Sequence, residues 1–496
     1  MKNIILAYDL GTSGLKAVAL DENGTILERI SESYKLATPH HLWAEQDPSD
    51  WWMAFCNCTR GILGKAGSAK IWAISICSQE ICSLAVDKNG DTVYPAMIWA
   101  DSRAHKEADT LEKKLGASEY YSLTGMRAAA NYPVAKIMWL KENRPELYEK
   151  TFRFINPKDY LNFKLTGRFA TDPECAAYMH LTDIGTGNWS QTLLDAAEID
   201  SLKLAEIIPA GEQLETVSRK ASFETGIPEG TPVIMGMGDG GGATLGTGAL
   251  DKGDAYTSLG TSSWVCAVSG SMKTDPQRRI SKIRYLDTFR DSGTMQTGGY
   301  SLNWIKNMLR AEYSEINRLA EISRPGANGV LFLPHLIGER SPFWDPRLCG
   351  GLLGLCSETT QGDVFRSVME GVSIHLNLIL NIICGTNEIQ AIQSMKLVGG
   401  GANSSVWQGI FADVFGVPVE TVRYPDDACA LAVGVIAGTS IGLYPSLSIV
   451  KKIQKSDVVI DPNPVNEKIY KELSQTYLKT EEYNRKISRL LSVFKA

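Results

Sequence analysis

The chain begins with apolar stretches separated by short polar turns, a pattern that predicts three strands over residues 3–31. Turn residues at 21–24 separate the second predicted strand from the third. A helix is expected next, because Asp47 can cap it and Pro48 suits its first turn. Further apolar runs predict buried strands at 70–78 and 83–87, and helices at 103–116 and 133–144.

A second round of the same pattern begins near residue 251, where strand, turn and strand follow one another again. After it we predict a long amphipathic helix at 361–382, a strand at 395–398, and helices up to 415, at 429–440 and at 463–492. Alternating strands and helices predict an α/β fold of two lobes, and a cleft between lobes suits a small ligand. We place the boundary at residue 248, with one lobe over 1–248 and the other over 249–496.

Composition narrows the class of protein. The 496 residues carry a net charge of −6 without a block of lysine or arginine, which argues against a nucleic-acid partner. The ten cysteines include no C-x-x-C pair and the six histidines show no metal-ligand spacing, so we expect buried thiols and no metal cage. The N-terminal apolar run is too short for a signal peptide, and no other uninterrupted run reaches the length of a membrane span. We therefore expect a cytoplasmic protein with no membrane partner.

Two short segments repeat the same kind of turn. DLGTSG at 9–14 and SLGTSS at 258–263 each follow a predicted strand and precede another apolar run. Glycine in such a turn lets backbone N–H groups and hydroxyls face one anion. We expect the pair to grip one polyphosphate, with Thr12, Ser13 and Lys16 on the first side. Two ordinary hairpins, with Lys16 as a solvated strand residue, are the alternative.

Two carboxylates are candidates for chemistry. Asp9 closes the first strand, where it can order Mg²⁺ through water, or merely start the turn. Asp239 is the only carboxylate in GMGDGGGA at 236–243, where small residues would let a ligand approach the backbone. A hydroxyl that attacks a γ-phosphate needs such a carboxylate to accept its proton. A helix expected after Gly240 would present its positive end there, and the alternative is that Asp239 is only an N-cap.

Three further segments contain candidate ligand contacts. GGGANS at 399–404 lies between a predicted strand and a predicted helix and could admit a nucleotide, although a generic tight turn explains it nearly as well. Gln79 and Glu80 form one polar island beside a buried strand, and Trp99 and Asp101 belong to a second. A ring beside carboxylates and an amide suits a polyhydroxylated ligand. A satisfied polar core for the first island, and a helix N-cap role for Asp101, are the alternatives.

These segments, in their order and spacing, resemble the FGGY carbohydrate kinases over nearly the whole chain. The resemblance lies closest to the xylulokinase-like and gluconokinase-like branches. It rests on DLGTSGLK at 9–16, WAEQDPSDWW at 43–52, PAMIWADSRA at 95–104, NPKDYLNFKLTG at 156–167, GMGDGGGA at 236–243, LGTSS at 259–263, PHLIGERSPFWDP at 334–346 and GGGANS at 399–404.

The resemblance implies an actin/Hsp70/hexokinase-type fold of two ribonuclease H-like lobes with a closing cleft, and the use of ATP with Mg²⁺. It implies that Asp239 is the catalytic base and that Asp9 orders the metal, with Asp239 also near it through water. The sugar would meet Gln79, Glu80, Trp99, Asp101 and Asp239. The phosphates and the nucleotide would meet Thr12, Ser13, Gly14, Lys16, Gly260, Thr261, Ser262, Gly299, Gly399, Gly400, Gly401, Asn403 and Ser404.

The chain departs from the family pattern where the acceptor would bind. Xylulokinases usually carry Gln-Met-His where this chain has QEI at 79–81, and glycerol kinases carry Gln-Arg-Glu. Gly240 follows Asp239 where xylulokinases often have asparagine and glycerol kinases have glutamine. The run WADSR at 99–103 leans toward gluconokinases. These departures leave the nucleotide half unaffected and the identity of the acceptor open.

The expected activity is ATP-dependent phosphorylation of a primary hydroxyl of a sugar or polyol. D-xylulose, giving xylulose 5-phosphate, is the first choice, and gluconate, ribulose, glycerol and other polyols stay open. A homodimer is also considered, because dimers are common in the family. Two other classes are a nucleotide-driven conformational ATPase without a small acceptor and a catalytically silent sugar sensor. The intact Asp239 and both turns argue against the sensor.

Overall fold

The structure is a computed structural model that describes residues 3–67, 69–456 and 458–494. The chain forms two compact units. Unit 1 consists of Met1–Gly248, Lys282–Phe289 and Asp427–Ile453, and unit 2 of Ala249–Ser281, Arg290–Asp426 and Gln454–Ala496. Residue 248 is one of these bounds, but unit 1 also takes two short segments from the range predicted for the second lobe.

Unit 1 is built on a sheet of six strands. The predicted meander is present as β1, β2 and β3, which pair antiparallel, whereas β5 lies parallel to β1 and β12 parallel to β5. The order across the sheet is β11 (Gln213–Thr216), β12 (Pro232–Ile234), β5 (Lys70–Ser78), β1 (Asn3–Leu10), β2 (Gly14–Leu20) and β3 (Ile26–Ser33).

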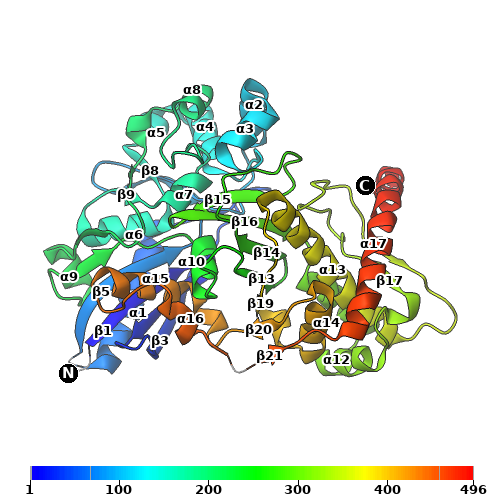
Figure 1. The fold of residues 1–496 in the computed structure, drawn as a ribbon. Coiled ribbons are helices and arrows are strands. Elements are labelled where there is room, and N and C mark those ends of the chain that lie inside the picture. The colour runs from blue at the N-terminus through cyan, green and yellow to red at the C-terminus, as the bar shows by residue number, and fades with distance from the viewer. Residues whose placement is uncertain (1–2, 68, 457, 495–496) are drawn as a thin grey trace. The chain divides into compact units, whose positions relative to one another are not determined.

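Three helices pack on this sheet. The first is α1 (Pro48–Ala66), which contacts β2 and β3 and begins as predicted, with the Asp47 side chain accepting from the Ser49 N–H. The others are α10 (Asp239–Gly246) and α15 (Ala428–Ser440), which contact each other and both contact β5 (Figure 1). Because α15 is apolar on nearly all sides, it is buried along most of its length.

The rest of unit 1 forms smaller sheets and short helices. One sheet runs in the order β4 (Glu45–Gln46), β7 (Thr92–Met97), β6 (Ser83–Val86) and β8 (Arg153–Ile155), and a second pairs β9 (Ala170–Thr171) with β10 (Glu206–Ile207). The helices are α2 (His105–Leu115), α3 (Ala117–Thr124), α4 (Pro133–Asn143), α5 (Pro145–Lys150), α6 (Pro157–Thr166), α7 (Pro173–Tyr178), α8 (Gln191–Ala197), α9 (Arg219–Thr225) and α16 (Ile449–Ile453). The strand β15 spans Ser281–Tyr285.

The strands of unit 2 belong to a seven-stranded sheet, and six of its strands repeat the sheet of unit 1. The order of these six is β21 (Val459–Ile460), β20 (Val419–Thr421), β19 (Met395–Val398), β13 (Ala255–Leu259), β14 (Ser263–Val268) and β16 (Thr288–Met295), and β15 follows β16 at the edge. The pairs β13–β14 and β14–β16 are antiparallel, β13–β19 and β19–β20 are parallel, and β20–β21 is antiparallel. Both units thus have the same sequence of strand directions, which confirms the ribonuclease H-like topology expected for both lobes.

The helices of unit 2 surround one apolar core. They are α11 (Gly299–Leu309), α12 (Tyr313–Ile322), α13 (Gln361–Asn387), α14 (Ser405–Phe415) and α17 (Pro464–Leu491), and a two-stranded sheet joins β17 (Leu331–Leu333) to β18 (Gly351–Leu353). By length and composition alone α13 could cross a membrane, but 67% of its most apolar 18-residue window is buried inside the protein. That degree of burial is typical of a core helix.

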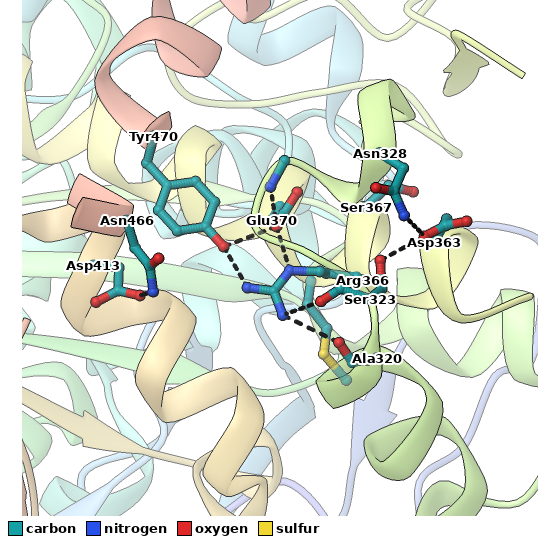
Figure 2. Close-up of polar contacts among 12 residues, drawn as sticks. Ala320, Ser323, Asn328, Asp363, Arg366, Ser367, Glu370, Asp413, Asn466 and Tyr470 are labelled. Atoms are coloured by element: carbon teal, nitrogen blue, oxygen red, sulfur yellow. Dashed lines mark hydrogen bonds and ion pairs between the residues drawn. The ribbon is translucent and has the colours of Figure 1, made fainter. Parts of the chain in front are cut away.

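A buried ion pair within α13 is hydrogen-bonded to a tyrosine of α17. Figure 2 shows the Arg366 guanidinium donating to the Glu370 carboxylate at 2.7 Å and to the Tyr470 hydroxyl at 2.8 Å. It also donates to the carbonyls of Ala320 and Ser323, both at 3.1 Å. All three nitrogens of this guanidinium therefore donate to acceptors of unit 2.

Candidate functional site

The first turn, between β1 and β2, belongs to one hydrogen-bond network with the predicted sugar residues. The Thr12 hydroxyl accepts from the Trp99 indole Nε1 at 2.8 Å and donates to Gln79 Oε1 at 3.3 Å. The Thr12 carbonyl accepts from Gln46 Nε2 at 2.6 Å. The Thr12 side chain, which we predicted to meet phosphate, is thus engaged by the two polar islands.

The neighbouring residues of this turn remain more open. Ser13 is exposed, and the Gly11 N–H donates to the Gly14 carbonyl at 3.0 Å. A Cβ on Gly14 would lie 2.6 Å from the Glu32 carbonyl oxygen, so glycine is required here by the pairing of β2 with β3. The exposed Ser13 is therefore the side chain of this turn that can reach a ligand.

The first polar island is a buried cluster at the end of β5. Gln79 is 1% exposed, and its Nε2 donates to Gln46 Oε1 at 2.8 Å, which also accepts from the Trp51 indole at 3.2 Å. Glu80 is buried as well. The ring of Trp99, in contrast, is 43% exposed, which leaves a face free for the C–H groups of a sugar.

Asp101 is held inside unit 1 by an arginine. Its carboxylate accepts from the Ala44 N–H at 2.8 Å and from Arg103 Nη2 at 2.5 Å, and it is fully buried. The same guanidinium lies 3.5 Å from the centre of the Trp43 ring. Because α2 begins at His105 with Ala104 as its N-cap, Asp101 does not have the alternative role of an N-cap. Its bonds describe a residue that positions the loop rather than one aimed at a ligand.

The sequence analysis missed a lysine that joins both islands. Lys136 on α4 is fully buried, and its ammonium donates to the carbonyls of Ile81 at 2.9 Å, Met97 at 3.2 Å and Ile98 at 2.6 Å. Burial lowers its pKa to about 7. Those carbonyls flank Glu80 and Trp99 in the chain, so Lys136 fixes the spacing of the two segments. A single lysine within the apolar stretch 133–140 was the available signal.

Asp9 stands at the end of β1 as predicted, next to a charged cluster. Burial raises the pKa of Asp9 to about 6, opposed by Lys16 and assisted by Asp427. The Lys16 ammonium lies 3.7 Å from the Asp427 carboxylate, which is also 2.8 Å from Arg29 Nε. Lys16 is therefore more than a solvated strand residue, because its ammonium already interacts with Asp427, whether or not it also contacts phosphate.

Asp239 is the first residue of α10, and Gly238 is the N-cap. The helix thus begins two residues earlier than predicted, and Asp239 lies in its first turn, where a negative charge is favourable. Asp239 is only partly buried. Since the helix includes this residue, the alternative of an N-cap is wrong.

The glycines around Asp239 are required mainly by the protein's own packing. A Cβ on Gly238 would overlap the Glu80 carboxylate, and one on Gly241 would overlap the Glu174 carboxylate. A Cβ on Gly242 would lie 2.7 Å from Cys77 Sγ. We predicted that these positions admit a ligand, but at all three the space is taken by side chains of unit 1. The carboxylates of Glu80 and Glu174 are thereby brought next to the start of α10.

Two thiols lie between the candidate carboxylates. Cys77 is the next-to-last residue of β5, and Cys429 is in the first turn of α15, with its Sγ 3.6 Å from the Asp239 carbonyl oxygen. The negative charges of Asp9 and Asp239 both act to raise the pKa of each thiol. Burial has a larger effect on the pKa of Cys77, and the hydrogen bond between the two thiols has a larger effect on the pKa of both. Asp9 and Asp239, far apart in the sequence, therefore lie around one pair of cysteines.

In unit 2, the second turn and the glycine segment line one cavity of about 690 Å³. Of the predicted nucleotide contacts it includes Gly260, Thr261, Gly299, Gly400, Gly401, Asn403 and Ser404. Nothing lies within 4 Å of a Cβ built on Gly400, so this glycine faces open space. The Gly299 N–H donates to the Gly260 carbonyl at 2.7 Å, which joins the start of α11 to the turn. Ser262 is not among the residues lining the cavity.

Other residues of this cavity were missed by the sequence analysis. Tyr300 on α11 and Tyr313 on α12 contribute rings that are 37% and 50% exposed. Asn317 holds the Ser404 hydroxyl at 2.7 Å, and Ser404 caps α14. Gly399 adopts φ +89° and packs against the Leu259 carbonyl, which makes it a turn residue behind the cavity wall. A cavity with exposed rings and glycine edges fits a nucleotide base and ribose.

The repeated topology and the paired turns define a protein of the actin and hexokinase fold type, and comparison with known proteins identifies its family. Residues 4–246 match the N-terminal domain of the FGGY family of carbohydrate kinases, and residues 255–440 match its C-terminal domain. The chain belongs to the FGGY family of carbohydrate kinases. It is accordingly a sugar kinase, rather than a conformational ATPase without a small acceptor, and kinases of this family use ATP as the phosphoryl donor.

Relatives carry two different substrate names. A xylulose kinase of Staphylococcus xylosus is 30% identical over 87% of this chain and 90% of its own length, and a gluconokinase of Bacillus subtilis is 28% identical over 93% and 90%. Among solved structures, a gluconate kinase of Lactobacillus acidophilus has a TM-score of 0.92 at 26% identity, covering 99% of both chains. A ligand-bound xylulose kinase of Lactobacillus acidophilus also has a TM-score of 0.92 at 26% identity, covering 97% of this chain and 98% of that one.

Proposed function

We propose that this kinase transfers the terminal phosphate of ATP to a primary hydroxyl of a neutral ketose, D-xylulose, and yields xylulose 5-phosphate. The observation that carries the proposal is the position of Asp239. It begins α10 beside the buried Glu80, in the same unit as Gln79 and Trp99. A proton acceptor and a polar surface suited to bind a sugar thus occur in the same unit.

Asp239 is assigned the role of general base. It would accept the proton of the attacking hydroxyl, because a partly exposed carboxylate next to a polar surface can reach that proton. It lies in the first turn of α10, where the helix N-terminus favours negative charge. A positioned base of this kind contributes about 10²–10⁴-fold to the rate.

Asp9 is assigned to Mg²⁺, with Asp239 nearby through water. The donor set fits, because Mg²⁺ prefers carboxylate oxygens and keeps much of its own hydration. The raised pKa of Asp9 also fits, since a cation beside a buried carboxylate would offset the cost of burying its charge. When bound, Mg²⁺ neutralises charge that develops on the phosphates. The chain's part is to hold the ion at the end of β1 and to keep Lys16 near it.

The nucleotide is assigned to the cavity of unit 2. The turn at Gly260 and Thr261 would face the phosphates, and Gly299, which lines the same cavity, would let them approach the start of α11 closely because it has no side chain. The open space at Gly400 and the exposed ring of Tyr300 would accommodate the base and ribose. Ser13 would meet phosphate from the first turn, and we keep Ser262 and Gly399 as supporting residues of the second.

Charge favours a neutral acceptor over a sugar acid. Glu80 and Glu174 both lie against the start of α10, next to Asp239. The ammonium of Lys136 is bonded to backbone carbonyls, and the Arg103 guanidinium is bonded to Asp101. A carboxylate ligand such as gluconate would therefore meet like charges, which disfavour its binding. We assign Gln79, Glu80 and Trp99 to contact the sugar, and Asp101 to support them through Arg103.

The test of the general base is Asp239→Asn. We expect turnover with D-xylulose to fall by about 10²–10⁴-fold. Nucleotide affinity, measured by calorimetry with ADP, should stay near that of the wild type, because the proposed nucleotide cavity lies in unit 2. Asp251→Asn, an exposed aspartate of unit 2, is the matched control and should leave both quantities unchanged. A variant Asp239→Asn that keeps most of its turnover contradicts the assignment.

The test of the acceptor is a panel of neutral sugars, polyols and sugar acids in an ADP-release assay. D-xylulose should give the highest kcat/KM, with ribulose and glycerol weaker. Gluconate is the second candidate, because the gluconate kinase structure matches as well as the xylulose kinase structure and because WADSR at 99–103 leans toward that branch. If gluconate is the best substrate, the charge argument above is wrong.

We also propose that the protein works in the cytoplasm. All ten cysteines are in the part of the chain that the structure describes, and none forms a disulfide. A homodimer stays a prediction, which sedimentation of the purified chain would test.

A further inference from the structure

Two thiols form a cluster with Asp9. They belong to Cys77, which packs against α10, and to Cys429, in the first turn of α15. Cys77 is the next-to-last residue of β5, Cys429 is the second residue of α15, and Asp9 is the next-to-last residue of β1. The two Sγ atoms and an Asp9 carboxylate oxygen all lie within 4.8 Å of one another. Cys77 is fully buried, whereas Cys429 and Asp9 are partly exposed, so an ion can enter from their side.

This donor set suits a different ion from the one assigned to the reaction. Mg²⁺ is a hard cation that takes oxygen ligands, so two sulfurs contribute nothing to its binding. Zn²⁺ and Cd²⁺ bind thiolates strongly and accept a carboxylate oxygen as a further ligand. Three protein ligands leave a fourth tetrahedral position for water.

We propose that Cys77, Cys429 and Asp9 form a binding site for a thiophilic divalent cation of the Zn²⁺ class, whose occupation inhibits the kinase. On binding, both thiols lose their protons to solvent and two sulfur–metal bonds form, with no change of oxidation state. Spacing along the chain did not indicate the site, because its ligands come from three distant elements. The expectation of no metal cage is thereby revised.

Inhibition follows from the two residues that the cation would engage or crowd. It would take the Asp9 carboxylate, which is assigned to order Mg²⁺, and it would sit beside Asp239, whose carbonyl accepts from Cys429. This step rests on the proposed function of Asp9, whereas binding itself does not. Binding and inhibition are therefore measured separately.

The binding experiment titrates the full chain with Cd²⁺ under a reductant that contains no thiol. We expect a thiolate-to-metal absorption band that saturates at one cation per chain. Cys77→Ser and Cys429→Ser should each lose the band and weaken binding of Zn²⁺ by at least about tenfold. Cys58→Ser is the matched control, because Cys58 is equally buried in unit 1 but lies on α1, and it should bind as the wild type does. Binding that is unchanged in both serine variants overturns the site.

The inhibition experiment follows turnover with Mg²⁺ in excess while Zn²⁺ is added. Wild type and Cys58→Ser should lose activity at the concentration at which Zn²⁺ binds, and a chelator should restore it. Cys77→Ser and Cys429→Ser, once shown by circular dichroism to be folded, should resist. Inhibition that a reductant reverses but a chelator does not would show oxidation of the thiols instead, and would overturn the proposal.

Failure of the proposed function is distinguishable from failure of the site. Asp9→Asn should lower turnover in the absence of Zn²⁺, and should weaken Cd²⁺ binding while keeping the thiolate band. If Asp9→Asn retains full turnover, the Mg²⁺ role of Asp9 is wrong, although the cation site stands. If Cd²⁺ binds through both cysteines without loss of turnover, the inhibitory part is overturned.

Discussion

His335 lies in the interior of unit 2 between two carboxylates, and its charge should be visible as a dependence of stability on pH. Its Nδ1 is 2.9 Å from the Glu339 carboxylate and its Nε2 is 2.5 Å from that of Glu481 on α17. Burial alone would lower the pKa of His335, but its hydrogen bonds with both carboxylates outweigh it and raise the pKa to about 9. His335 is thus protonated in the folded protein at neutral pH.

The magnitude follows from linkage between protonation and folding. Unfolding returns the pKa from about 9 to 6.5, which at about 1.4 kcal/mol for each pH unit corresponds to about 3 kcal/mol. Because the folded pKa is the higher one, this stabilisation is fully present below pH 6.5 and is lost as the pH rises through about 9.

The perturbation is His335→Gln, which removes the titrating group. We expect it to destabilise the protein more at about pH 6 than at about pH 10, by about 3 kcal/mol of unfolding free energy from urea titrations. Comparing the two proteins at each pH cancels the contributions of other titrating groups, such as Lys136. Nuclear magnetic resonance of histidine-labelled protein reports the pKa directly, with His180 as an internal control, because burial lowers its pKa to about 3.

Two results would refute the reasoning. One is a titration of His335 near or below 6.5 in the folded protein. The other is a destabilisation by His335→Gln that does not change with pH. The pKa of the neighbouring His375 is lowered by burial, and its Nδ1 forms a hydrogen bond of 3.1 Å with the Tyr477 hydroxyl. His375 should therefore not titrate with His335.

Three further predictions concern other parts of the molecule. The pH profile of kcat/KM should fall on the acid side with a midpoint near 6, because Asp9 has its pKa raised to about that value by burial; a midpoint near 4 would contradict this. Gly241→Ala should cost about 1–3 kcal/mol of stability, because the added methyl group crowds Glu174. It should also lower kcat, because α10 carries the base. Calorimetric melting and turnover measure the two effects, and an unchanged melting temperature argues against the overlap. Arg366→Met should cost about 3–5 kcal/mol in urea unfolding because it leaves Glu370 buried without its cation, and Arg366→Met with Glu370→Leu should recover part of that loss.

Local patterns in the sequence were sufficient to predict most elements of the fold. The meander of β1 to β3, the cap at Asp47, the strand β19 and the helix α17 all occur where periodicity and turn residues indicated. The repeated Gly-Thr-Ser turns indicated the internal repeat, because a short turn between strands has a strong local signature. The helix at 361–382 was predicted too short, since α13 continues to Asn387.

The parts that depend on distant contacts could not be predicted in the same way. The glycines at 238, 241 and 242 were interpreted as room for a ligand, whereas Glu80, Glu174 and Cys77 occupy that space. Lys136, Tyr300 and the thiol of Cys429 gain their places only through tertiary packing, which periodicity does not encode. Asp101 accepts from Arg103, two residues away, and from the distant Ala44 N–H, and the second of these contacts likewise depends on packing.

The late arrival of α15 in unit 1 has a consequence for synthesis of the chain. Its residues, 428–440, cover β1 and β5, although those strands leave the ribosome hundreds of residues earlier. Until then the apolar side of the first sheet needs another cover, such as a chaperone. A gene truncated after codon 248 would therefore encode an aggregation-prone fragment with an exposed apolar sheet face. A circularly permuted gene that starts with the codons for 427–453 would supply the covering helix before the sheet is synthesised.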